Sequence, residues 1–525
     1  MGLVEDSPKE RRIWIAFIVA GLIAGLVLRF RLASFARMPG HGDSAFYYTV
    51  AKNIVDGRGP VIDYIVYFFE GLLPLPHYAG DFWNPTAAFL VAIPMFFLGK
   101  SIGAALVSPI LAGIVPAAAG FLAGRRYTGS FAGGALAAIL TFFASFEVWF
   151  SVTTEAIIFA GAFGSLAIYF MMRRTDSGRY LLLAAIFTGL ANLIRQDNIL
   201  LLVTLEACVL ASVLPWKRKL VLGLGALCIH LAILSPLLAM NYAQLHTLFP
   251  HGPAKTAYLT TYEDFHSYDK EIDWHTLRGT FGISGIIKRR LHTATENLNQ
   301  VEYFLTPVLS VLLFAALADL LILHRNKDRF WLLFPAAVFA VLEYGFYTFV
   351  ASLSGPGSLI KCLATLLPFI SMVIVGLFSN FASSKIGLAA AVVLLAAHSA
   401  YLGYGKNLSS TIYYNGVYTQ YAQIRTSILN DASRRSLPKQ DVTVLARDTW
   451  DVYEGTGFKT VMVPNNDLNT IVFVAQHYGA HYILLPAKRP QLEKIYNGLT
   501  PDPRFQLVAS VPNSDLRIYW INFSH

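Results

Sequence analysis

A succession of apolar segments runs through the first 404 residues and constrains the fold more than any other feature of the chain. We expect membrane spans at 13–33, 102–123, 130–150, 154–172, 181–194, 197–214, 219–240, 301–323, 330–350, 362–379 and 386–403. Of the 525 residues, 55% are hydrophobic and only 14% are charged, a composition that soluble domains do not have. The sequence therefore predicts a polytopic α-helical membrane protein with about 11 transmembrane helices.

Short basic clusters between these spans predict the orientation of the chain. The clusters lie at 125–126, 173–179, 217–219 and 324–329. They all fall on the cytoplasmic side if the short apolar run 86–98 does not cross and the region 181–214 crosses twice. The basic tail before the first span places the N-terminus in the cytoplasm. We therefore expect a multi-pass cell-membrane protein whose C-terminal part is extracytoplasmic.

Two domains are predicted. Residues 1–404 form the transmembrane domain, with external loops at 34–85 and 241–300. Residues 405–525 form a small extracytoplasmic α/β domain, because strand-like runs alternate there with helical patterns. The strand-like runs are 442–447, 460–464, 482–487, 505–511 and 516–523. No glycine-rich phosphate loop opens a helix in this domain, so no nucleotide is expected. The net charge of +9 comes mostly from the clusters between spans, so no nucleic acid is expected either.

The first external loop contains the sequence HGDSAFYYTVAKNIVDGRGP, residues 41–60. Phe46, Val50 and Ile54 are four residues apart and predict a helix that ends before Gly57. Asp43 stands at the start of this helix. An N-cap explains the residue, because Asp accepts backbone N–H bonds there. A carboxylate at the membrane surface that deprotonates an acceptor hydroxyl also explains it.

Further polar residues lie at the ends of spans, and each has a structural and a functional interpretation. The segment 77–85, HYAGDFWNP, is either an interfacial helix start or a pocket wall in which Trp83 stacks on a sugar or lipid. Glu155 is either a helix-start acid or a second catalytic carboxylate. Arg195 and Asp197 form either a local ion pair between two helices or a phosphate-binding site. Lys361 either snorkels or contacts phosphate.

These motifs resemble the GT-C superfamily of membrane glycosyltransferases, and most closely the branch of protein O-mannosyltransferases and aminoarabinose transferase. The motifs that carry the resemblance are GDSAFYYTVAKNIVDGRG, FWNPTAAFLVAIPMFFLGK, SVTTEAII, GLANLIRQDNILLL and IKCLATLLPF. The resemblance implies a polyprenyl-phosphate sugar donor, an external active site and inversion at the sugar. It also implies that Asp43 is the base and that Lys361 meets the donor phosphate. Ser44 stands where relatives often carry a second acid. This weakens a metal-binding role, so a divalent metal is not indicated, but metal dependence stays open.

We therefore expect a glycosyltransferase that moves a sugar from a polyprenyl-phosphate donor to a hydroxyl of a glycan, lipid or protein acceptor. Asp43 and Glu155 are the predicted catalytic residues. The predicted substrate-binding residues are His41, Tyr47, His77, Asp81, Trp83, Asn84, Arg195, Asp197 and Lys361. A transporter or flippase of lipid-linked saccharides and a non-catalytic membrane scaffold are the alternatives. A transporter predicts internal repeats with broken helices at matching positions, which the sequence does not display.

Overall fold

The computed structural model describes residues 6–323, 327–353, 356–382, 384–489, 491–499 and 502–523. The chain divides into two compact units. The first comprises Met1–Phe35, Trp83–Leu248 and Ile287–Ser409. The second comprises Ala36–Phe82, Phe249–Ile286 and Ser410–His525.

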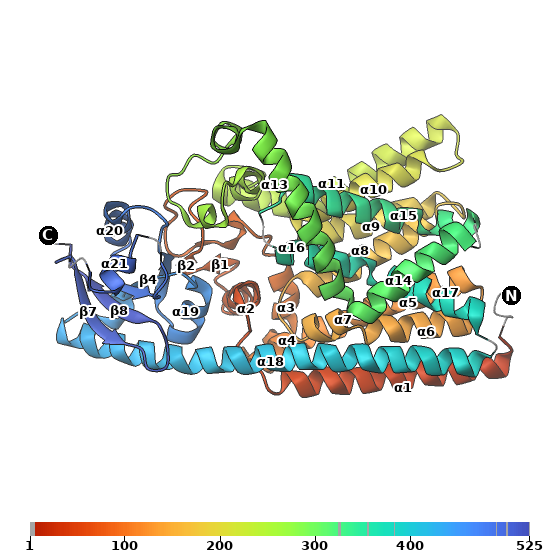
Figure 1. Cartoon of the computed structure of the whole chain (residues 1–525), viewed down its shortest axis with the longest axis horizontal. Coiled ribbons are helices and arrows are strands. Elements are labelled where there is room, and N and C mark those ends of the chain that lie inside the picture. Colours follow the sequence, from red (N-terminus) through yellow and green to blue (C-terminus); the bar gives the residue numbers. More distant parts are fainter. Residues whose placement is uncertain are drawn as a thin grey trace. The chain divides into compact units, whose positions relative to one another are not determined.

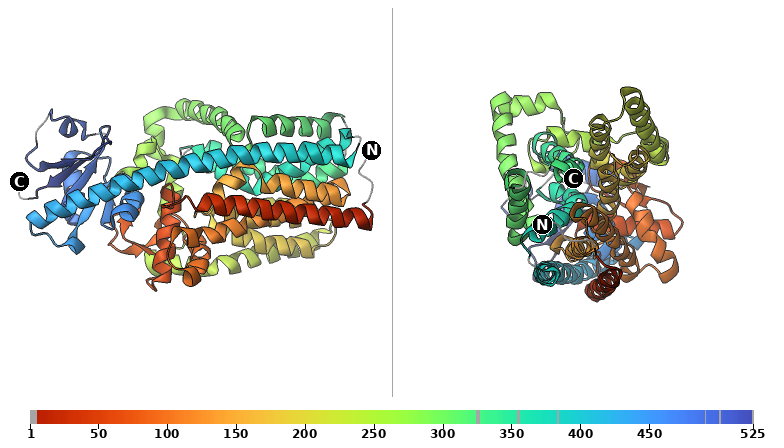
Figure 2. Two further views of the ribbon diagram at one scale, coloured as in Figure 1. Left: turned by 90° about the horizontal axis from the view of Figure 1, so that it is seen from below. Right: turned by 90° about the vertical axis from the view of Figure 1, so that its right-hand side faces the viewer.

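The first unit is helical, and most of its helices run roughly parallel to one another (Figures 1 and 2). Its helices before residue 250 are α1 (Pro8–Ala33), α3 (Thr86–Leu98), α4 (Ile102–Ala112), α5 (Ile114–Thr128), α6 (Phe131–Phe142), α7 (Ser145–Phe150), α8 (Ile157–Met172), α9 (Arg179–Ile194), α10 (Ile199–Leu210) and α11 (Trp216–Leu245). Those that follow are α14 (Pro307–Ala318), α15 (Lys327–Gly345), α16 (Pro356–Leu363) and α17 (Leu367–Phe381). Two long helices, α13 (Trp274–Leu305) and α18 (Lys385–Arg434), contribute residues to both units.

Small residues allow the helices of the first unit to approach closely. A Cβ atom on Gly124 of α5 would lie 2.6 Å from the Cβ of Ala137 on α6, and one on Gly120 would lie 2.8 Å from the hydroxyl of Thr141. Helices associate in lipid by packing of this kind rather than by hydrophobic burial, so glycine is needed at such contacts. The outer surface of the first unit carries apolar side chains, such as Val27 of α1, which is 63% exposed.

The length and composition of the helices make this a multi-pass membrane protein. Within the described ranges, six helices are long and apolar enough to cross a membrane, or seven if the bent pair at 274–322 is one span. Four shorter apolar helices, α3, α6, α8 and α9, accompany them. The predicted number of crossings, about 11, and the predicted orientation stay predictions.

The second unit is built on a six-stranded sheet of order β2-β5-β4-β6-β8-β7 (Figure 1). Its strands are β2 (Tyr64–Ile65), β4 (Thr443–Ala446), β5 (Lys459–Met462), β6 (Tyr482–Leu485), β7 (Phe505–Ser510) and β8 (Arg517–Ile521). The first four strands in the sheet order are parallel, and β8 and β7 are antiparallel to their neighbours. Helices α19 (Thr449–Thr456), α20 (Leu468–His477) and α21 (Glu493–Tyr496) connect the strands, and α2 (Gly42–Val55) also belongs to this unit.

These units differ from the two domains that we predicted. The five predicted strands of the C-terminal region are present within three residues of their expected ends. However, the sheet has a sixth strand from the first external loop, because Tyr64 pairs with Thr460 and Ile65 with Val461. The predicted boundary between residues 404 and 405 lies five residues before the boundary between the two units at Ser409–Ser410, and helix α18 continues across both to Arg434. Much of the predicted 241–300 loop is helix α13.

Candidate active site

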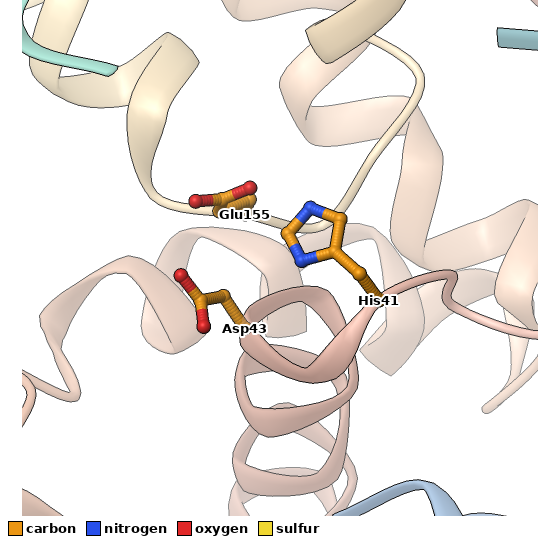
Figure 3. Close-up of side chains that lie close together, drawn as sticks. All are labelled: His41, Asp43 and Glu155. Carbon is orange, nitrogen blue, oxygen red and sulfur yellow. The ribbon is translucent and has the colours of Figure 1, made fainter. Parts of the chain in front are cut away.

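The N-terminal turn of α2 carries the predicted base. His41 is the N-cap residue and Asp43 lies in the first helical turn, so the interpretation of Asp43 as the N-cap is wrong. A ring nitrogen of His41 and a carboxylate oxygen of Asp43 lie within 4.8 Å of each other. The carboxylate is half-buried and projects from the start of α2 (Figure 3). This pair can exchange a proton or offer two donor atoms to a cation.

Helix α19 of the C-terminal region holds α2 in place. A Cβ atom on Gly42 would lie 2.0 Å from the indole ring of Trp450, so only glycine fits at the first helical position. Two turns further along α2, the carboxylate of Glu454 accepts a hydrogen bond from Thr49 and lies 2.5 Å from Nζ of Lys52. The orientation of the turn that carries Asp43 therefore depends on residues about 400 positions away in the sequence.

Asp451 of α19 is a buried acid beside this turn. Burial raises its pKa to about 8, and the charges of Asp448 and Glu454 act in the same direction. The charge of His41 acts in the opposite direction and lowers the pKa of Asp451. In the described part of the chain, Oδ1 of Asp451 has no hydrogen-bond partner. The turn of α2 is therefore surrounded by more acidic groups than the sequence predicts.

The other predicted substrate residues of this unit are largely buried. Tyr47 is 3% exposed and packs edge-on against Phe46. His77 is 6% exposed, and its Nε2 lies 3.5 Å from the carboxylate of Asp81. Tyr47 and His77 therefore lie in the interior of the unit. The other predicted site residues of this unit, His41, Asp43 and Asp81, are half-buried.

Within the first unit, the chain unwinds between α9 and α10 and exposes an ion pair at the break. Arg195 is extended, and its Nη2 lies 2.6 Å from Oδ2 of Asp197, with Nε 3.3 Å from Oδ1. The same carboxylate accepts hydrogen bonds from the hydroxyl of Tyr347 and, at 2.9 Å, from the thiol of Cys362. A bidentate pair with two further donors fixes the guanidinium in one orientation.

Side-chain amides satisfy the unwound backbone. Nδ2 of Asn84 donates to the carbonyl oxygens of Asn192 and Leu193 at 3.0 and 3.2 Å, and its Oδ1 accepts from Gln196. Asn192 in turn donates to the carbonyl oxygens of Arg195 and Gln196. A backbone break in lipid is tolerated only with such partners. The amide of Asn84, which we predicted to bind substrate, is fully used in supporting the break.

Lys361 and Glu155 form a second ion pair in the first unit. Glu155 is 1% exposed and lies in the turn before α8, two residues ahead of its first helical residue (Figure 3). Lys361 lies on α16 next to Cys362, so this short helix connects both ion pairs. Trp83, which we also predicted to bind substrate, precedes Asn84 in the sequence and is half-buried. The structure thus collects Glu155, Asp197 and the two predicted phosphate-binding cations in one unit.

Three residues around Asp197 were not predicted from the sequence. Tyr347 and Cys362 contact Asp197, and Glu343 is a fully buried acid that interacts electrostatically with both Asp197 and Cys362. Glu343 could have been noticed as a lone acid within the apolar run 330–350, because acids inside spans are rare and usually functional. No local pattern marks Tyr347 or Cys362.

Comparison with known proteins defines the fold class. Residues 83–240 match the family model for dolichyl-phosphate-mannose-protein mannosyltransferase. The crystal structure of ArnT from Cupriavidus metallidurans bound to undecaprenyl phosphate superposes with a TM-score of 0.56 at 15% identity, over 97% of this chain and 98% of that chain. The sequence matches no curated protein significantly.

Two archaeal structures have the same architecture. The oligosaccharyltransferase of Archaeoglobus fulgidus in complex with Zn and sulfate has a TM-score of 0.56 at 12% identity, over 96% of this chain and 73% of that chain. AglB from the same organism, in complex with an inhibitory peptide and a dolichol-phosphate, has a TM-score of 0.52 at 12% identity, over 93% and 71%. The chain therefore has the GT-C fold of membrane glycosyltransferases. The resemblance to this superfamily that the motifs predicted is confirmed.

The role of Asn84 predicts a loss of stability rather than of substrate affinity. Asn84→Leu leaves two carbonyl oxygens without donors and lowers the free energy of unfolding by about 1–3 kcal/mol. Thermal unfolding of the purified protein measures the change. Asn299→Leu, an exposed position on α13, is the control and leaves the midpoint unchanged. An unchanged midpoint for Asn84→Leu would contradict the supporting role.

The raised pKa of Asp451 predicts a pH-dependent stability. Between the ordinary Asp pKa, about 4, and its pKa of about 8 in the protein, the folded state holds a proton that the unfolded state has lost. Stability is therefore greatest below this window and falls as pH rises through it. We expect Asp451→Asn to flatten the decline in unfolding temperature between pH 5 and 8. The exposed control Asp441→Asn keeps the wild-type slope. Parallel curves for wild type and Asp451→Asn would exclude this assignment.

Proposed function

We propose that the protein transfers a sugar from a polyprenyl-phosphate donor to an acceptor hydroxyl at the external face of the membrane, with inversion at the sugar. The observation that carries the proposal is the guanidinium of Arg195 at a helix break inside an apolar unit, held by Asp197, whose carboxylate also accepts hydrogen bonds from Tyr347 and Cys362. A charged group at such a depth is costly and is retained where it serves a function. A pre-oriented guanidinium matches the geometry of phosphate as well as that of carboxylate.

The location of this cation supports a lipid-linked donor. A polyprenyl chain stays in the bilayer, so an enzyme that uses it must present its phosphate site within a helical unit. The family-model match covers Arg195 and Asp197. The ArnT structure contains bound undecaprenyl phosphate, and the AglB structure contains a dolichol-phosphate. We infer the same class of donor for this chain.

In the proposed reaction, Asp43 acts as the general base. Its carboxylate takes the proton from the acceptor hydroxyl, and the oxygen attacks the anomeric carbon of the donor. The bond between that carbon and the phosphate oxygen breaks on the opposite side, which inverts the configuration. The polyprenyl phosphate leaves with the electron pair, and Arg195 and Lys361 stabilise its charge. Glu155 orients Lys361 through their ion pair. His41 and Asp81 line the acceptor side of the reaction.

The proposal is tested with Asp43→Asn. The amide keeps the shape of the side chain but cannot take a proton, so we expect kcat to fall by about 10²–10⁴-fold. The measurement is sugar transfer from a panel of polyprenyl-phosphate sugars by the full chain in nanodiscs. Asp56→Asn, an exposed acid that follows the last residue of the same helix, is the matched control and keeps its activity. Wild-type kcat in Asp43→Asn would sink the assignment of the base.

A further inference from the structure

The parallel strands of the second unit end at one edge of the sheet. The connection after β4 runs through α19 to β5 on one side of β4, whereas the connection after β6 runs through α21 to β7 at the opposite edge of the sheet. The connections after β4 and β6 therefore diverge. In open α/β sheets, ligands bind at the carboxyl ends of strands where the connections diverge in this way. The residues that follow β4 and β6 are Arg447–Asp448 and 486–489.

Each of these two connections carries an arginine, and both arginines reach the same carboxylate. Nη2 of Arg447 lies 3.2 Å from Oε1 of Glu263, and Nη1 of Arg489 lies 3.4 Å from Oε2. Glu263 comes from the segment 249–286 and is a third exposed, whereas the side chain of Arg489 is 1% exposed. The two guanidinium groups thus form a fork around a carboxylate, which is the geometry that binds carboxylates and phosphates.

Glu263 and Asp448 are two acids that interact with the arginines of the fork, yet one donor of Arg489 is left over. In the described part of the chain, Nε of Arg489 has no hydrogen-bond partner although the side chain is buried. Burial and the charge of Arg447 lower the pKa of Arg489 to about 10. Burial, together with Arg489 and Arg447, lowers the pKa of the neighbouring His266 to about 3, so this imidazole adds no charge of its own. A buried donor without a hydrogen-bond partner is costly, so an acceptor atom of a bound anion at Nε of Arg489 stabilises the fork.

We propose that the Arg447–Arg489 fork binds an anionic group of the acceptor, a carboxylate or a phosphate, and that Glu263 occupies this place until the acceptor arrives. The inference rests on the proposed function, because it assigns the anion to the molecule that receives the sugar. The carboxylate of Glu263 stands in for the ligand.

Aromatic residues connect the fork to the predicted base within the same unit. Tyr67 stacks beside His266, with ring centroids 6.2 Å apart and an interplanar angle of 17°. Asp43 and Tyr262, the residue before Glu263, both interact electrostatically with Tyr67. An acceptor held by its acidic group at the fork therefore has aromatic surface between that group and Asp43. Sugars pack well on such surfaces, so an acidic saccharide or a phosphorylated glycan fits the site.

Anion binding by the full chain in nanodiscs tests the proposal. Inorganic phosphate and glucuronate are the two probes, titrated separately by calorimetry without any sugar donor. Glu263→Gln removes the internal competitor, and we expect about tenfold tighter binding. Arg447→Gln removes one arm of the fork at a half-exposed position, and we expect about tenfold weaker binding. Arg504→Gln, which breaks another arginine–aspartate pair of the same unit, is the control and binds like wild type.

The outcomes separate this proposal from the proposed function. Stronger binding of phosphate than of glucuronate identifies a phosphate on the acceptor, and the reverse preference identifies a carboxylate. Equal binding by wild type, Glu263→Gln and Arg447→Gln would reveal only an adventitious anion and would overturn the proposal. Asp43→Asn keeps the binding constants of wild type, so a failure of the base assignment leaves these titrations unaffected.

Discussion

The ion pair between Arg195 and Asp197 imposes the main constraint on the first unit. It lies where two apolar helices are interrupted, and breaking such a pair by removing one partner costs several kcal/mol, about 3–5. The surrounding residues compensate for it. Tyr347 and Cys362, which are distant in the sequence, donate hydrogen bonds to the Asp197 carboxylate. Asn84 and Asn192 donate hydrogen bonds to backbone carbonyl oxygens at the break. Well-packed hydrophobic side chains in place of a buried ion pair often give equal or greater stability, so stability alone does not explain this cluster.

The second unit depends on a different interaction, the pairing of a two-residue strand of the first loop with the sheet of the C-terminal region. This pairing brings α2 against α19, where Trp450 and Glu454 contact it. The helix that carries the proposed base is thus built into the C-terminal unit. This arrangement gives the α/β region a role in orienting Asp43, in addition to any contact that it makes with the acceptor.

Sequence patterns predicted those features that depend on local periodicity. The apolar helices, the helix at 42–55 and the five C-terminal strands each have a repeat of their own, and the motif order predicted the superfamily fold. The patterns failed where pairing is long-range. Asp197 meets Cys362 and Tyr347 across 165 and 150 residues, and no local signal encodes these contacts. A strand of two residues such as β2 is too short to show alternation. The ion pair Arg195–Asp197 was one of the two interpretations that the sequence offered, whereas Glu155 and Lys361 were predicted singly and not as a pair. Asn84 and Tyr47 were predicted to bind substrate from residue type. In the structure, Asn84 hydrogen-bonds the backbone at the helix break and Tyr47 is buried, and their substrate role stays a prediction.

The central claim is that Arg195 is held ready for the phosphate of a polyprenyl lipid. A density map of the full chain in nanodiscs with undecaprenyl phosphate tests it most directly. We predict phosphate density in contact with the guanidinium of Arg195, with Asp197 still bound to the other side of that group. A well-defined lipid phosphate elsewhere, with the Arg195–Asp197 pair untouched, would contradict the claim.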